Sequence, residues 1–211
     1  MVQKIIKAKR HIEEAGISMD EINEWNYFSI KKWYNRIRGQ YQNVTWRRLT
    51  CNNLGAPKWM FILNLAIQNR LLTRSRLHAW GITDEKSCPI CNEAEESIEH
   101  LMFKCRTTGE IWSKILRWQG ISRAPMEWQR EIQWAENNAT GSNAAAQVYR
   151  LALACAVYHI WNERNNRIFQ DHQKTVEMIV RQIVIEVAIR GSMNRKIGKK
   201  IEEIDTYCKG G

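Results

Sequence analysis

The chain has 211 residues, a formal net charge of +10 at pH 7 and ten tryptophans. No stretch reaches the roughly 18 apolar residues of a membrane span. The N-terminus also lacks the apolar run of a signal peptide, so we expect an intracellular protein, nuclear location included, and neither a membrane protein nor a secreted one. A basic, tryptophan-rich chain is a candidate nucleic-acid binder, although the tryptophans could serve only the core and the charge only solubility.

In chain order the sequence divides into four expected parts, and its length suits one sizeable core, or one core with a small added module. Residues 1–24 predict a charged lead-in with a helix that begins near Met19. Residues 25–136 predict a helical domain, and residues 137–143 a linker loop, because they are rich in Asn, Gly and Ser. Residues 144–211 predict a C-terminal helical segment that ends in a frayed tail.

Helical periodicity dominates from Pro57 onward and almost no alternating strand pattern is present, so we expect a mainly α fold. Pro57 is suited to the first position of a helix, and Thr175 is suited to an N-cap. Gly81 and Gly120 are expected to end two further helices. Apolar residues recur at helical spacing in the stretches 57–72, 73–81, 107–120, 125–136, 144–169 and 175–194.

Residues 25–83 contain no Asp or Glu over 59 residues, and we call them the acid-free segment. It carries ten Lys and Arg, so residues 1–86 hold fifteen basic against seven acidic side chains, while residues 87–140 hold six against eight. Such a positive field can neutralise phosphates, and the counterions released give an affinity that falls steeply with salt. The candidate nucleic-acid-binding residues are Arg47, Arg48, Lys58, Arg70, Arg74 and Arg76.

Aromatic side chains are interleaved with these cations, and exposed ones can stack on unpaired bases. We expect more of them in the core than on the surface. They are Trp33, Tyr34, Tyr41, Trp46 and Trp80.

The stretch "CPICNEAEESIEHLMFKC" has the spacing C-x2-C-x8-H-x4-C, formed by Cys88, Cys91, His100 and Cys105. Three thiolates and one imidazole are a common ligand set for zinc, and two cysteines separated by two residues can bind one ion from a tight turn, which Pro89 would stiffen. We expect His100 on a short helix and Cys105 beyond its far end. Four protein ligands leave no open position, so the predicted site holds one structural zinc ion in a small CCHC knuckle.

Alternatives remain open at this point. The three cysteines could be small buried apolar residues with His100 as a hydrogen-bonded partner, and His78 is an alternative ligand. Cys155 is expected in the core, and His159 is expected to be a packed residue rather than a general base. The sequence has no Gly-rich phosphate loop, no nucleophile elbow and no paired aspartates for two metals, so we expect neither an enzyme nor a small-molecule substrate.

Five stretches in a fixed order carry a family resemblance. They are "FSIKKWY", "APKWMFILNLAIQNRLLTRSRLHAWGI", "CPICNEAEESIEHLMFKC", "EIWSKILRW" and "VYHIWNERNNRIF". Together they resemble the zinc-binding region at the C-terminal end of reverse transcriptases from plant LINE-type non-LTR retrotransposons. The likeness covers about residues 28–169.

The resemblance implies that Cys88, Cys91, His100 and Cys105 ligate zinc, and that Lys58 and the 70–76 stretch occupy the family's basic positions. It implies a partner that is RNA or single-stranded or nicked DNA, and a reverse transcriptase polymerase domain as a further partner. The family's polymerase carries a paired-aspartate motif, which this chain lacks, so reverse transcription is not expected of it.

Two functions are therefore weighed. The first is a non-catalytic zinc-binding module of retrotransposon origin that binds RNA or DNA through the acid-free segment. The alternative is a protein-interaction or scaffold module that docks an acidic partner or a polymerase, a role that the long helices after Asn143 suit.

Overall fold

A computed structural model of the chain describes residues 16, 18, 31, 34, 35, 44–51, 54–170 and 172–209, with the backbone alone at residues 205–209. The expected helix near Met19, Trp33 and Tyr41 lie outside these described residues. Met1–Val44 and Thr45–Gly211 form two compact units, and all of the helices discussed below belong to the second unit.

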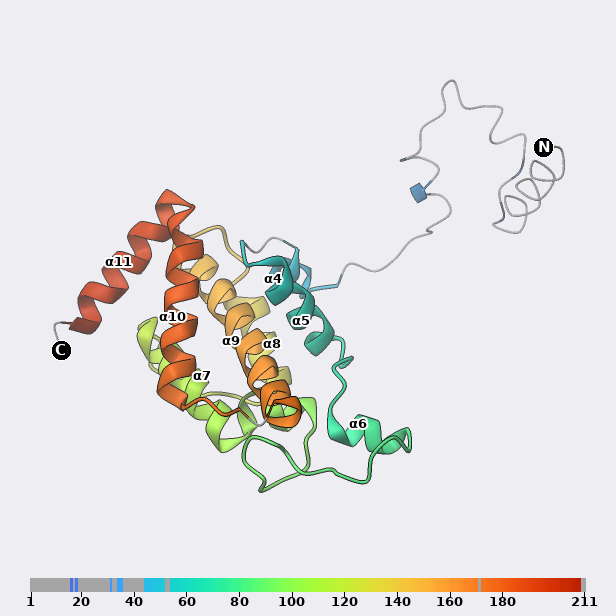
Figure 1. Cartoon of the computed structure of the whole chain (residues 1–211). Helices are drawn as coiled ribbons and strands as arrows, with labels where there is room; N and C mark the ends of the chain where they lie inside the picture. The colour runs from blue at the N-terminus through green and yellow to red at the C-terminus, as the bar shows by residue number, and fades with distance from the viewer. Residues whose placement is uncertain are drawn as a thin grey trace. The chain divides into compact units, whose positions relative to one another are not determined.

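The longest helix, α9 (Ala144–Phe169), is the centre of this unit, and it runs through the middle of Figure 1. Its N-terminal two-thirds is apolar on nearly every side, a pattern that requires burial all round. Helices α5 (Pro57–Ile67), α7 (Arg106–Trp118) and α10 (Val176–Ser192) pack against it. The mainly α fold is therefore as predicted, and no strand occurs among the described residues.

The N-terminal helices of the unit follow the predictions in part: α5 ends at Ile67, five residues before the predicted end at 72, and Asn69 has a φ of +53°, which a helix does not continue through. Helix α4 (Arg47–Thr50) is one turn that packs on α5, and α5 begins at Pro57 as expected. Helix α6 (Arg74–Ala79) is short and ends before Gly81, whose φ of +68° favours glycine.

Helix α8 (Trp128–Asn138) begins three residues after the predicted start at residue 125. The reason is the carboxylate of Glu131, which is fully buried and accepts hydrogen bonds from the Met126 N–H at 3.1 Å and from Arg123 at 2.9 Å. Tyr149 of α9 donates to the same carboxylate at 2.5 Å. These bonds hold the preceding residues in a non-helical path.

The tail from Asn194 onward was expected to be frayed, and this prediction is wrong. Residues Arg195–Lys209 form helix α11, which packs against α10, α9 and α7. Ile197, Ile201 and Ile204 lie four and three residues apart and are buried, so they form the apolar stripe of a docked helix.

Residues 139–143 connect α8 to α9, and the helices on both sides of this loop share one core. The division of the chain at residues 137–143 stays a prediction about its organisation. In the described part of the chain, no helix combines the length and apolar character that crossing a membrane requires.

Candidate metal centre and basic surface

The structure brings the four predicted zinc ligands together. The ligand atoms of Cys88, Cys91, His100 and Cys105 all lie within 4.8 Å of one another, and Cys91 Sγ is 3.3 Å from His100 Nε2. Ligands around a tetrahedral zinc at about 2.3 Å are about 3.8 Å apart, so the donors fit one ion with little movement. The chain therefore has a closed Cys3His set for one structural zinc ion.

Local structure explains how the first two ligands meet. The Cys88 N–H donates to Ala94 at 2.8 Å and the Asn92 N–H donates to Cys88 at 2.8 Å, so the chain reverses tightly after Cys88. Asn92 has a φ of +57°, in the left-handed region that asparagine tolerates. A single antiparallel bridge between Ser87 and Glu95 closes the loop.

Of the other two ligands, His100 begins a short irregular turn, η1 (His100–Lys104), and Cys105 directly follows it. Ser97 Oγ accepts the His100 N–H at 3.0 Å, which starts the turn. Phe103, with a φ of +79°, breaks the helical path and stacks on Trp112 at 4.8 Å between ring centroids. The chain then reaches Cys105 directly before α7, so His100 sits on a short helical turn, as predicted, with Cys105 past its end.

Backbone N–H groups surround all three sulfurs. Those of Ile90 and Cys91 bond to Cys88, that of Glu93 bonds to Cys91 at 3.4 Å, and the first turn of α7 bonds to Cys105. Such donors stabilise thiolates and orient metal ligands.

The thiols of Cys88 and Cys105 are buried side by side and share a hydrogen bond. This bond lowers the pKa of Cys105 to about 5 against the effect of burial, and the N–H groups of Thr108 and Thr107 lower it further. The same bond, together with burial, raises the pKa of Cys88. One thiolate is thus favoured before any cation binds.

Two arginines of helix α9 hold the loop that carries Cys88 and Cys91, which we call the cysteine loop. Arg164 forms a two-pronged ion pair with the buried Glu96, through Nε at 2.7 Å and a terminal nitrogen at 2.8 Å. The same carboxylate accepts the Arg74 N–H at 2.6 Å, so it caps α6 in place of the Thr73 hydroxyl. Arg167 donates to the carbonyl of Ile90, between the first two cysteines, at 2.9 Å.

The six predicted nucleic-acid-binding residues separate into two groups. Arg47, Arg48, Lys58 and Arg70 are exposed. The other two are half-buried and engaged within the fold: Arg74 donates to the Ser87 carbonyl at 2.8 Å, and Arg76 donates to the Asn69 carbonyl.

A further cationic residue, Arg150, was not predicted from the sequence as a binding residue. This residue of α9 lines a cavity of about 590 Å³, which we call the basic cavity. The other lining residues include Arg48 of α4, Thr140, Ser142 and Gln147. Burial lowers the pKa of the Arg150 guanidinium, and the positive charge of Arg48 lowers it further. The sequence did not predict a binding role for Arg150, because this residue lies within an apolar run that is typical of a core helix.

The aromatic residues of the acid-free segment lie largely at its surface where the structure describes them. Tyr34 is 60% exposed and Trp80 56% exposed, while Trp46 is half-buried. Trp59 on α5, in the same segment, is buried in the core. The other core tryptophans come from α7 and α8: Trp112, Trp118 and Trp128.

The structure also places three further residues that the sequence singled out. His78 lies on α6 and is not part of the metal cluster, so it is not the fourth ligand. Cys155 and His159 are buried on α9, and His159 Nε2 lies 3.2 Å from Glu186 of α10. His159 is therefore a packed residue of the helix interface.

Comparison with protein families gives a match that agrees with this geometry. No curated protein and no solved structure matches the chain. Residues 28–112 match the family model described as zinc-binding in reverse transcriptase, and all four ligands lie within this match. Residues 28–112, about two-fifths of the chain, are therefore similar to the zinc-binding domain of reverse transcriptases.

Proposed function

We propose that this chain is a non-catalytic nucleic-acid-binding module of retrotransposon reverse transcriptase origin, in which a structural zinc ion holds a basic surface in place. Its ligand is single-stranded RNA or single-stranded or nicked DNA, and its place of action is inside the cell, the nucleus included. The matched family model covers a zinc-binding domain rather than a polymerase, which supports a non-catalytic role.

The observation that carries this proposal is the basic cavity. Two arginines from helices far apart in sequence converge on it, and its lining residues include hydroxyl and amide donors but no carboxylate. Arg150 is buried and donates to the carbonyls of Ala139 and Gly141. The charge of the exposed Arg48 opposes that of Arg150, and a phosphate between the two guanidinium groups would offset this repulsion. The cavity also lies at the N-terminal end of α9, where the helix dipole favours an anion.

The zinc centre holds a different basic residue of the acid-free segment, Arg76, which lies outside the basic cavity. The cysteine loop holds α6 through Glu96, whose main-chain carbonyl accepts the Ser75 N–H at 3.2 Å. Arg76 is the next residue after Ser75 and lies on the same helix. Loss of zinc would therefore release Arg76 as well as the loop.

Fluorescence anisotropy with a labelled single-stranded RNA and a DNA of the same sequence, over a salt series, tests the proposal. We expect binding that weakens steeply with salt, and Arg48→Gln should lower the slope of log K against log salt by about 0.7. Arg181→Gln on the exposed face of α10 removes the same charge elsewhere and is the matched control. Absence of micromolar binding at about 50 mM salt would contradict the proposal.

A second candidate function is docking of a reverse transcriptase polymerase domain. Helix α10 and its C-cap residue expose four apolar side chains along one side of the helix, and soluble proteins rarely leave such a stripe uncovered. They are Met178, Ile185, Ile189 and Met193.

Co-purification with a polymerase domain separates the two candidates. Docking predicts a complex that survives nuclease treatment and is lost in Ile185→Ser with Ile189→Ser. A complex that nuclease abolishes would instead support binding through nucleic acid.

A further inference from the structure

A second cavity, of about 370 Å³, lies where the end of α5, helix α8 and the cysteine loop meet. Its volume is at the lower end of the range for small-ligand sites, about 300–1,000 Å³. Trp46, Ile67 and Trp128 provide apolar wall, and Asn69, Glu99 and Gln129 provide polar groups. None of these residues is a zinc ligand, and we call the cavity the Trp128 pocket.

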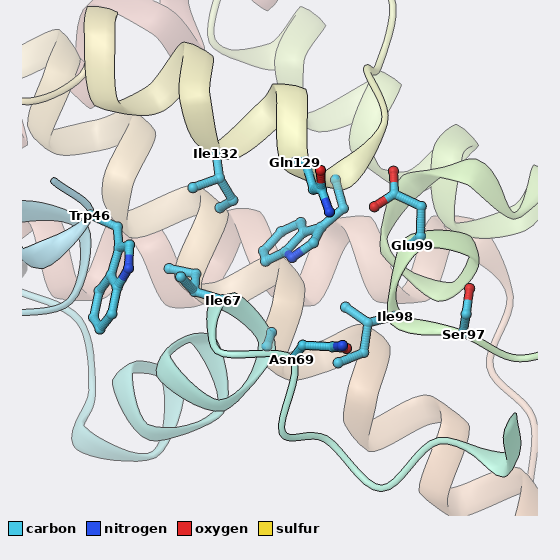
Figure 2. A pocket seen from close by; sticks show the side chains of 10 residues that line it. Trp46, Ile67, Asn69, Ser97, Ile98, Glu99, Gln129 and Ile132 are labelled. Atoms are coloured by element: carbon cyan, nitrogen blue, oxygen red, sulfur yellow. The ribbon is translucent and has the colours of Figure 1, made fainter. Parts of the chain in front are cut away.

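The pocket has an apolar end and a polar end. In Figure 2, Trp46 lies at one end and Glu99 at the other, with Asn69 and Gln129 on opposite sides between them. A flat aromatic ligand with a polar edge would therefore place its faces against apolar side chains and its edge toward Glu99. An unstacked nucleobase has this shape and polarity.

The polar groups of the pocket are available for a ligand. Glu99 is half-buried, and within the described part of the chain it forms no ion pair or side-chain hydrogen bond. The side-chain amides of Asn69 and Gln129 likewise make no hydrogen bond to a described residue. A ligand with N–H donors would therefore meet a carboxylate whose oxygens can still accept hydrogen bonds.

The carboxylate also selects among bases. Two oxygens side by side can accept two parallel N–H bonds, and the Watson–Crick edge of guanine offers adjacent N1–H and N2–H donors. Adenine and cytosine present one amino group beside an unprotonated ring nitrogen, and uracil presents one N–H between two carbonyls. Each of these three would place an acceptor against Glu99.

A cationic site for the phosphate adjoins the pocket. A neighbouring cavity is lined by Thr73, Ser75 and Arg76, and it shares Asn69 and Ser97 with the Trp128 pocket. Arg76 donates to the Asn69 carbonyl, which fixes the guanidinium beside the pocket rim. A base in the pocket would thus have its phosphate within reach of an arginine and two hydroxyls.

From this arrangement we infer that the Trp128 pocket binds one unstacked guanine of single-stranded nucleic acid, with Glu99 reading the base edge and Arg76 contacting the phosphate. The inference rests on the proposed function and adds a base preference to it. A side chain of a partner protein is the competing occupant.

Titration of the zinc-loaded full chain with GMP, AMP and UMP, followed by calorimetry, tests the inference. We expect GMP to bind at least about tenfold more tightly than AMP or UMP. Glu99→Gln should reduce this preference to near unity, because an amide offers only one acceptor oxygen. Glu110→Gln, which removes an exposed carboxylate of α7, is the matched control and should leave the preference intact.

The outcomes distinguish this inference from the proposed function. Equal or absent binding of the three nucleotides, with salt-dependent oligonucleotide binding retained, would overturn the guanine pocket and leave the basic surface standing. Loss of all oligonucleotide binding would overturn both. A preference for GMP that persists in Glu99→Gln would also overturn the assigned role of Glu99.

Discussion

Arg164 and Glu96, 68 residues apart in sequence, form a buried two-pronged ion pair that fixes the zinc-binding loop to the central helix. Both side chains are almost fully buried. The pair thus couples the metal centre to the core of the protein, and it joins the matched segment to a helix that lies beyond it.

Replacement of Arg164 by Met should destabilise the protein by about 3–5 kcal/mol, because Glu96 would be left buried without a cation. We also expect weaker zinc binding, since the loop that carries Cys88 and Cys91 loses its attachment. Urea unfolding and competition with a chromophoric chelator measure the two effects. Arg117→Met on the exposed face of α7 is the control, and equal behaviour of both variants would contradict the coupling.

The features that could be predicted from the sequence are those whose determinants are local. The zinc ligands lie within eighteen residues, so their spacing alone predicts the set, and helical periodicity predicts most helices. The pair between Arg164 and Glu96 is not encoded by any spacing, because it exists only once α9 packs behind the loop. The same holds for Arg150, whose charge meets Arg48 only in the folded chain. Helix α11 was missed because its apolar stripe, which includes Ile201, is narrow and surrounded by charges.

One zinc ion per chain should be found by elemental analysis, and a strong chelator should remove it with loss of cooperative melting, because metal binding and folding share free energy. Cys88→Ser with Cys91→Ser should abolish the bound zinc. Cys51→Ser is the matched control, since Cys51 is exposed and outside the cluster. Stoichiometric zinc in the double variant would mean that other residues hold the ion.

Helix α11 approaches α10 closely at Gly191, where a Cβ atom would collide with the side chains of Ile201 and Ile197. We therefore expect Gly191→Ala to destabilise the protein by about 1–3 kcal/mol, although alanine is the better helix former. Gly198→Ala on α11 is the matched control, because a Cβ there meets its nearest atom at an ordinary 3.5 Å. This second variant should be neutral or stabilising by up to about 1 kcal/mol. Thermal melting of both variants measures the difference, and the opposite order would show that α11 does not dock in this way.

The buried His159 should make stability dependent on pH. Burial lowers its pKa from the ordinary 6.5, and the nearby charges of Lys174 and Lys58 lower it further against the attraction of Glu186. Because the folded pKa is below the unfolded one, the unfolded chain binds the proton more readily, and stability is lost as pH falls below about 6.5 toward the folded value. His159→Gln removes this term, so the free energy of unfolding of the variant should approach that of the unmodified protein as pH falls from 8 to 5, a window around the ordinary value. Zinc release at low pH affects both chains alike and cancels in the comparison. A difference between them that stays constant across this range would contradict a neutral buried imidazole at this interface.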